Sequence, residues 1–192
     1  MKNIPLSTKK KLESALKSSL KLALVEMKSV KKGFSEESLR YIVMSEISKK
    51  EIWGTFPNPI ESENKLLFEQ EYNILKIKKR TFKPDIISKN ENEHLLAIEL
   101  KIKNDIIDVR KCKEYISESK GWVSFDLAAA VYAIMPGAGQ INYHMEQKIN
   151  HAEKIGKNIH NSRLLVAFVE WERDLLGRNG SSKSRIRLEW IY

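Results

Sequence analysis

The sequence predicts an α/β fold in which helices flank a central mixed sheet. Apolar residues recur at three- and four-residue steps in segments 7–32, 35–50, 105–119 and 141–159, as they do on amphipathic helices. Other segments alternate apolar and polar residues or are apolar throughout, and both patterns are typical of strands. Because helical and strand-like segments alternate over only 192 residues, we expect a single domain.

The first half of the chain predicts two helices followed by a three-stranded meander. Gly33 ends the lysine-rich first helix, and Ser35 begins the second, whose first turn is acidic. Glycine and proline residues predict a loop over residues 53–63. The meander strands are expected at residues 67–76, 81–88 and 95–103.

The second half of the chain predicts an extension of the same sheet. A buried strand is expected at residues 127–135, another strand at 163–172, and a tail strand at 185–192 that pairs with it. The single domain then comprises an N-terminal amphipathic helix (1–33), a core (35–135) and a C-terminal extension of the sheet (136–192).

The composition limits the kinds of partner and the cellular compartment that we expect. The 34 Lys and Arg residues exceed the 25 Asp and Glu residues, and the net charge of +9 favours a polyanionic partner. Cys112 is the only cysteine, which excludes internal disulfides and cysteine-based zinc clusters and indicates a reducing compartment. The sequence predicts neither an export signal nor a membrane-spanning helix, so we expect a soluble, cytoplasmic protein without a membrane partner.

Two short motifs carry the chemistry. Pro84-Asp85 lies on one expected strand, and Glu99-Leu100-Lys101 lies on the next. Strand alternation sends Glu99, Lys101 and Lys103 to one face, and a hairpin between the two strands brings Asp85 close to Glu99. The apolar face of the second strand consists of Leu96, Ile98, Leu100 and Ile102.

Two carboxylates beside a lysine suit metal-assisted hydrolysis. Asp85, Glu99 and the backbone carbonyl of Leu100 form an oxygen ligand set for Mg²⁺, with Mn²⁺ as a substitute. A bound cation lowers the pKa of a water, and Lys101 orients that water or stabilises the charge of the transition state. An isolated Glu-x-Lys on a strand is usually a solvated face, but the Pro-Asp spacing and the order of elements favour a site.

These motifs resemble the PD-(D/E)xK nuclease superfamily, whose restriction-endonuclease-like fold has an αβββαβ core. The resemblance covers residues 35–135, about half of the chain. It implies metal-dependent hydrolysis of DNA, with Asp85 and Glu99 as ligands and Lys101 as catalytic base or electrostatic stabiliser. It also implies an auxiliary glutamate on the first core helix, for which Glu46 on the apolar stripe ranks ahead of Glu37 and Glu51, and a polar residue on the following helix, here Lys111.

Further basic residues are candidates for nucleic-acid contacts. These are Lys103, Lys111, Arg178, Lys183 and Arg185. The segment 177–185 fits a phosphate-binding loop and a solvated hairpin loop equally well. The basic first helix fits a nucleic-acid arm or a dimer contact, but an amphipathic helix that caps the core is favoured.

Other motifs predict no site. The four histidines show no metal-ligand spacing, and Gly137-Ala138-Gly139 lacks the spacing of a dinucleotide-binding loop, so no nucleotide cofactor is expected.

The sequence therefore predicts a DNA nuclease, with an endonuclease favoured and RNA left open as a substrate. An alternative is a non-cleaving nucleic-acid-binding or assembly subunit with the same fold. A third possible function is the binding of acidic proteins, which depends only on the net positive charge of the chain. One motif per chain is compatible with a homodimer, because coordinated cleavage of two strands needs two sites.

Overall fold

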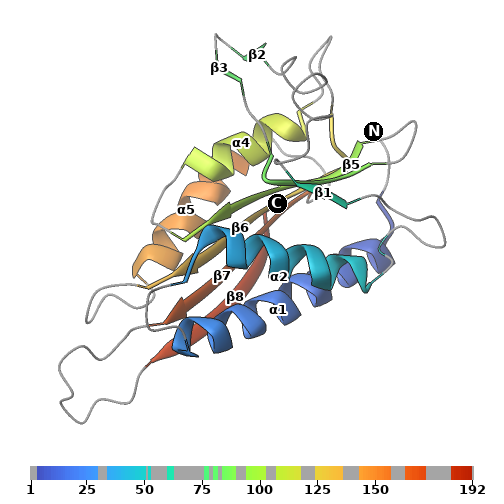
Figure 1. Ribbon diagram of the computed structural model, residues 1–192. Helices are drawn as coiled ribbons and strands as arrows, with labels where there is room; N and C mark the ends of the chain where they lie inside the picture. The colour runs from blue at the N-terminus through green and yellow to red at the C-terminus, as the bar shows by residue number, and fades with distance from the viewer. Residues whose placement is uncertain are drawn as a thin grey trace.

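A six-stranded mixed sheet lies at the centre of the computed structural model (Figure 1), in the order β1-β4-β5-β6-β7-β8. β5, β6 and β7 run parallel, whereas the pairs β1–β4, β4–β5 and β7–β8 are antiparallel. The strands are β1 Ile60–Ser62, β4 Ile86–Lys89, β5 His94–Lys101, β6 Leu127–Ile134, β7 Leu164–Trp171 and β8 Ser184–Ile191. The structure describes residues 4–29, 34–50, 52, 60–62, 76–77, 80–81, 84–89, 94–102, 107–117, 124–135, 143–156, 163–171 and 183–191.

Helices cover both faces of this sheet. One apolar core joins α1 and α2 to the face that carries Leu96, Ile98 and Leu100. A second core joins α4 and α5 to the opposite face, which carries Ala130 and Tyr132. The helices are α1 Leu6–Ser29, α2 Glu36–Ser48, α4 Ile107–Tyr115 and α5 Tyr143–Gly156. With helices on both sides, every residue of β6 is buried, as its uninterrupted apolar sequence predicted.

The mixed sheet with flanking helices confirms the predicted α/β class, and β8 pairs with β7 as expected for the tail. The meander was partly wrong. The segment 53–63, predicted as a loop, contains β1, which pairs with β4. The segment 81–88 is not one strand, because Thr81 ends β3 (Arg80–Thr81) and β4 begins at Ile86. β3 pairs with β2 (Lys76–Ile77), and the Lys76–Thr81 pair joins the first two segments of the predicted meander. Residues 67–75 lie outside the described part of the chain.

The N-terminal helix is a core element. Leu12, Leu16 and Leu20 on α1 are fully buried, and Lys9 lies over the ring of Trp190 on β8, 5.3 Å from its centroid. This confirms the expectation that α1 caps the core with one face and carries its lysines on the other. In the described ranges, no helix has both the length and the apolar character needed to cross a membrane.

Candidate functional site

The β4–β5 hairpin brings Asp85 and Glu99 together. Ile86 pairs with Ile98, so Asp85, one position before Ile86, lies beside Glu99, one position after Ile98. The Asp85 side chain is held by the backbone, because its Oδ2 accepts a 2.7 Å hydrogen bond from the N–H of Leu100. Asp85 is 6% exposed and Glu99 1% exposed. Two buried acidic side chains therefore lie next to each other at the end of the hairpin.

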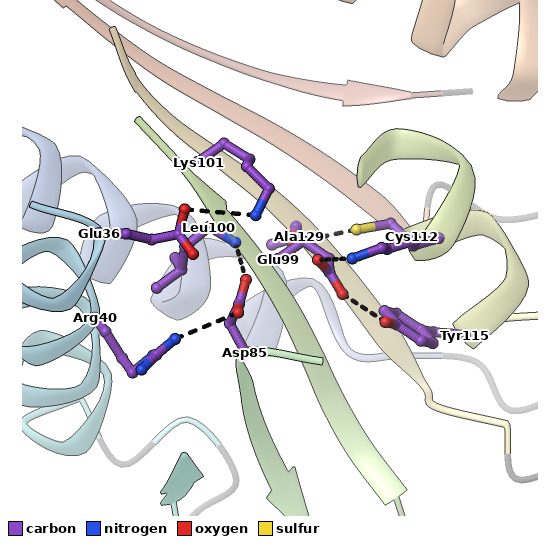
Figure 2. A network of polar contacts seen from close by, with 10 residues as sticks. Glu36, Arg40, Asp85, Glu99, Leu100, Lys101, Cys112, Tyr115 and Ala129 are labelled. Atoms are coloured by element: carbon purple, nitrogen blue, oxygen red, sulfur yellow. Dashed lines mark hydrogen bonds and ion pairs between the residues drawn. The ribbon is translucent and has the colours of Figure 1, made fainter. Parts of the chain in front are cut away.

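Helix α4 supplies two donors to Glu99. The Lys111 ammonium donates to Oε2 at 2.9 Å, and the Tyr115 hydroxyl donates to Oε1 at 2.5 Å (Figure 2). These residues are four positions apart, so they project from the same face of the helix. Phe125 holds Tyr115 in place, since its N–H donates to the Tyr115 carbonyl at 2.7 Å and the two rings pack edge to face. Both carboxylate oxygens of Glu99 thus have fixed partners.

The protonation of Glu99 is strongly perturbed. Burial, followed by the charge of Asp85, raises the pKa of Glu99 from 4.5 to about 8, although Lys111 and Tyr115 act in the opposite direction. Burial and the charge of Glu99 also raise the pKa of Tyr115 well above 10.0, so the phenol keeps its proton and remains a donor. Burial and the neighbouring Asp85 therefore both disfavour the ionised form of Glu99.

Helix α2 contacts the same site from the other side of the sheet. Ser35 caps the helix by accepting a 3.0 Å hydrogen bond from the N–H of Ser38. In the first turns, the Glu36 carboxylate accepts from Lys101 at 3.4 Å, and the Arg40 guanidinium pairs with Asp85 at 3.5 Å (Figure 2). Glu36 and Arg40 are also four positions apart, so one face of α2 contacts both β4 and β5.

The exposed fraction of the side chains increases from Asp85 and Glu99 to the groups that surround them. The side chain of Glu99 is 1% exposed and that of Asp85 8%, whereas those of Lys111 and Lys101 are 23% and 24% exposed. Asp85 and Glu99 therefore form the base of the site. Its rim combines the two lysines with Glu36, whose side chain is 32% exposed.

The structure brings the predicted residues Asp85, Glu99, Lys101 and Lys111 together, but it places Glu46 elsewhere. Glu46 is 8% exposed and pairs with Lys49 at 2.6 Å. It lies ten residues beyond Glu36, which is about 15 Å along the helix axis. The buried glutamate of α2 therefore has its partner on the same helix, and Glu36 is the α2 carboxylate that contacts the site.

The remaining predicted residues divide into two groups. Lys183 and Arg185 are exposed at the start of β8, three strands away from β5. Lys103 and Arg178 lie outside the described residues. The backbone N–H of Leu100 anchors Asp85, whereas the role of its carbonyl as a ligand stays a prediction.

The sequence analysis missed Glu36, Arg40 and Tyr115. Glu36 was interpreted only as part of an acidic first turn that favours the helix dipole. Its spacing of four residues to Arg40 is a signal, as is that of Tyr115 to Lys111, but such pairs are common on solvated helix faces. Nothing in the local sequence distinguishes a pair that faces a site from one that faces solvent.

The donor set of the site fits a hard divalent cation. Asp85 and Glu99 supply carboxylate oxygens, and Mg²⁺ typically binds to one or two carboxylates while it keeps several waters. Asp85 lies close enough to Glu99 for its charge to raise the pKa of Glu99, so one cation could contact both carboxylates. In the described part of the chain, no three His, Cys, Asp or Glu side chains form a ready-made metal cluster, so the two carboxylates are the candidate ligands.

Comparisons of the chain with models of known protein families, with curated proteins and with solved structures gave no match.

Proposed function

We propose that this protein is a divalent-metal-dependent nuclease of the PD-(D/E)xK type that hydrolyses phosphodiester bonds in DNA. The observation that carries the proposal is the pairing of Asp85 and Glu99 at the end of the β4–β5 hairpin, with Lys101 two residues beyond Glu99 at the end of β5. Asp85 and Glu99 are the proposed ligands of Mg²⁺. When bound, the cation lowers the pKa of a water and neutralises charge on the phosphate.

Lys101 is the proposed catalytic lysine. It is partly exposed at the rim of the site, and Glu36 holds its ammonium from the neighbouring helix. In that position the ammonium can orient the attacking water and stabilise the negative charge that develops on the phosphate oxygens. Such electrostatic stabilisation is strongest when the charge is fixed before substrate binds, which is the contribution of Glu36.

The groups on α4 and α2 prepare the two carboxylates. Tyr115 and Lys111 hold the orientation of Glu99, and the Leu100 N–H and Arg40 hold that of Asp85. Arg40 and Lys111 are also partly exposed cations next to the acids, and a guanidinium is well suited to bind a phosphate through two hydrogen bonds. We propose that Arg40 exchanges its contact with Asp85 for one with the scissile phosphate.

Cleavage assays test this proposal. Supercoiled plasmid, single-stranded DNA and RNA are incubated with the wild type, Asp85→Asn, Lys101→Met and the control Lys17→Met, which changes an exposed lysine on α1. We expect cleavage with Mg²⁺ or Mn²⁺, none with chelator, a loss of at least about a hundredfold in the two site variants, and none in the control. The absence of metal-dependent cleavage on every substrate would contradict the proposal.

A second candidate is a nucleic-acid-binding subunit that does not cleave. It is favoured by one observation: Arg40 and Lys111 already pair with Asp85 and Glu99, so charges within the protein compensate both acids. This candidate predicts salt-sensitive binding that is indifferent to metal and to Asp85→Asn. A filter-binding titration of the same variants, with and without Mg²⁺, separates the two functions.

A further inference from the structure

The strand β8 is a long edge of the sheet. Among the described residues, it pairs with β7 alone, and its eight residues match those of β7 without a register shift. The opposite edge, β1, has only three residues. Edge strands that avoid pairing with other chains are usually short, bulged, charged, interrupted by proline, or covered by another segment. Residues 184–191 form a long strand without a bulge or proline, and their charged side chains, Arg185, Arg187 and Glu189, have both signs.

The two faces of β8 have opposite character. Arg185, Arg187 and Glu189 lie on the face that carries Phe168 and Val166 of β7. Ile186, Leu188 and Trp190 lie on the other face, where they are partly buried against the core under α1. The backbone edge of β8 that faces away from β7, which is unpaired among the described residues, therefore lies between a charged stripe and an apolar stripe.

We propose that β8 is a dimer interface, in which the β8 strands of two copies of this chain pair antiparallel around a two-fold axis at Leu188. In that register Arg187 of each copy lies opposite Glu189 of the other, and Ile186 lies opposite Trp190. The apolar and charged stripes then continue across the interface, and backbone hydrogen bonds join the two sheets into one.

The charges of β8 select this register. An axis at Arg187 would place the two Arg187 side chains directly opposite each other, and an axis at Glu189 would do the same for the two glutamates. An axis at Ile186 would place Arg185 opposite Arg187. Like charges in directly opposed positions destabilise a strand pair, so Leu188 is the favoured centre. Within the chain Arg187 already pairs with Glu189 at 2.6 Å, which shows that the two side chains can meet on this face.

The interface leaves the candidate site accessible. Asp85, Glu99 and Lys101 belong to β4 and β5 and the turn that enters β4, and two strands, β6 and β7, separate β5 from β8. The proposal goes beyond the proposed function and does not depend on it. A non-cleaving protein would form the same dimer, and a monomer could still cleave DNA.

Charge reversal tests the register. Arg187→Glu leaves two glutamates facing two glutamates across the axis, and Glu189→Arg leaves two arginines facing two arginines. We expect the wild type to be a dimer by sedimentation equilibrium and each variant to be a monomer. A mixture of the two variants should form a heterodimer, because both glutamates of one chain then face arginines of the other. This rescue cannot come from the pairing within a chain, which stays broken in the mixture.

Cysteine crosslinking is a second, independent measurement. Leu188→Cys places the new thiols of both copies opposite each other, whereas Arg185→Cys places them about 20 Å apart along the strands. The native Cys112 is buried and contributes to neither reaction. We expect a disulfide-linked dimer only for Leu188→Cys under mild oxidation.

Two results would overturn the proposal. One is a wild type that stays monomeric at every concentration in sedimentation equilibrium, together with a Leu188→Cys variant that forms no disulfide-linked dimer. The other is a wild-type dimer that survives both charge reversals, since this would place the interface on another surface.

Discussion

At the scale of single residues, Glu99 differs most from an ordinary solvated glutamate. It is 1% exposed, lies beside Asp85, and receives hydrogen bonds from Lys111 and Tyr115. Burial of a carboxylate disfavours its charged form, and a neighbouring carboxylate adds to this effect. Ionisable groups with strongly shifted pKa values are typical of functional sites.

The raised pKa of Glu99 predicts a pH dependence of stability. Because the pKa is about 8 in the folded chain and 4.5 when unfolded, the folded state binds the proton more tightly. Its contribution to stability is fully present below pH 4.5 and is lost as the pH rises towards 8. We expect the free energy of unfolding, measured in urea with chelator, to fall by up to about 1.4 kcal/mol per pH unit in this window.

Glu99→Gln should remove this slope, and the exposed Glu37→Gln should leave it unchanged. The glutamine keeps the size of the side chain and cannot ionise, so the variant should be more stable than the wild type at pH 8 without metal. Equal slopes in all three proteins would show that Glu99 is ionised in the folded state throughout the range.

The two glutamates of α2 make a second prediction at this scale. Glu36 contacts Lys101, whereas Glu46 contacts Lys49. Glu36→Gln removes the charge that holds Lys101, so we expect the rate of DNA cleavage to fall by about tenfold or more. Glu46→Gln should change the rate by less than about twofold. Single-turnover assays measure both, and a larger loss in the Glu46 variant would return that residue to the site.

At the scale of elements, helices α2 and α4 contact the β4–β5 hairpin from two sides. Each contributes side chains four positions apart, Glu36 and Arg40 from α2 and Lys111 and Tyr115 from α4. The site thus depends on the placement of both helices on opposite faces of the sheet. That placement comes from the apolar cores on the two faces, so elements without any site residue also control the geometry.

Helix α1 is such an element. Leu16 is fully buried in the core that α1 shares with α2, so Leu16→Ala leaves a cavity there. We expect a loss of about 2–5 kcal/mol in the free energy of unfolding by urea. Leu22→Ala on the same helix, where the side chain is 46% exposed, should cost less than about 1 kcal/mol. Similar losses in both variants would contradict the assignment of α1 as a core helix.

At the scale of the whole molecule, the net charge of +9 favours association with polyanions. Lys183 and Arg185 are exposed at the start of β8 and provide further positive charge. If these residues contact phosphates, the double variant Lys183→Gln/Arg185→Gln should weaken DNA binding equally for all sequences. The slope of log K against log salt should fall in magnitude by up to about 2.

Fluorescence anisotropy across a salt series measures this slope. The matched control is Lys10→Gln/Lys17→Gln, which removes two exposed lysines from α1 on the opposite side of the sheet from α4 and α5. An equal reduction in both double variants would indicate that only the net charge matters, and no reduction in the first would exclude its two residues from the binding surface.

Features that depend on residues close together in the sequence were predicted better than features that depend on distant residues. The alternation in 95–103 correctly predicted that Leu96, Ile98 and Leu100 face the core, because strand periodicity is a local property. The three residues of β1 form a strand only through pairing with β4, so their own sequence carries too short a pattern to detect. β2 and β3 join two segments that were predicted as neighbouring strands, but with two residues each they are too short for their bounds to be predicted.

The α/β class, the paired acids Asp85 and Glu99, and the lysine beside them could all be predicted without coordinates, because each follows from periodicity or close spacing along the chain. Three contacts could be found only from the tertiary structure. Lys101 contacts Glu36 and not Glu46, Arg40 contacts Asp85, and Tyr115 contacts Glu99. These contacts join residues from 16 to 65 positions apart. They depend on how helices cross the sheet, which is set by packing over the whole core.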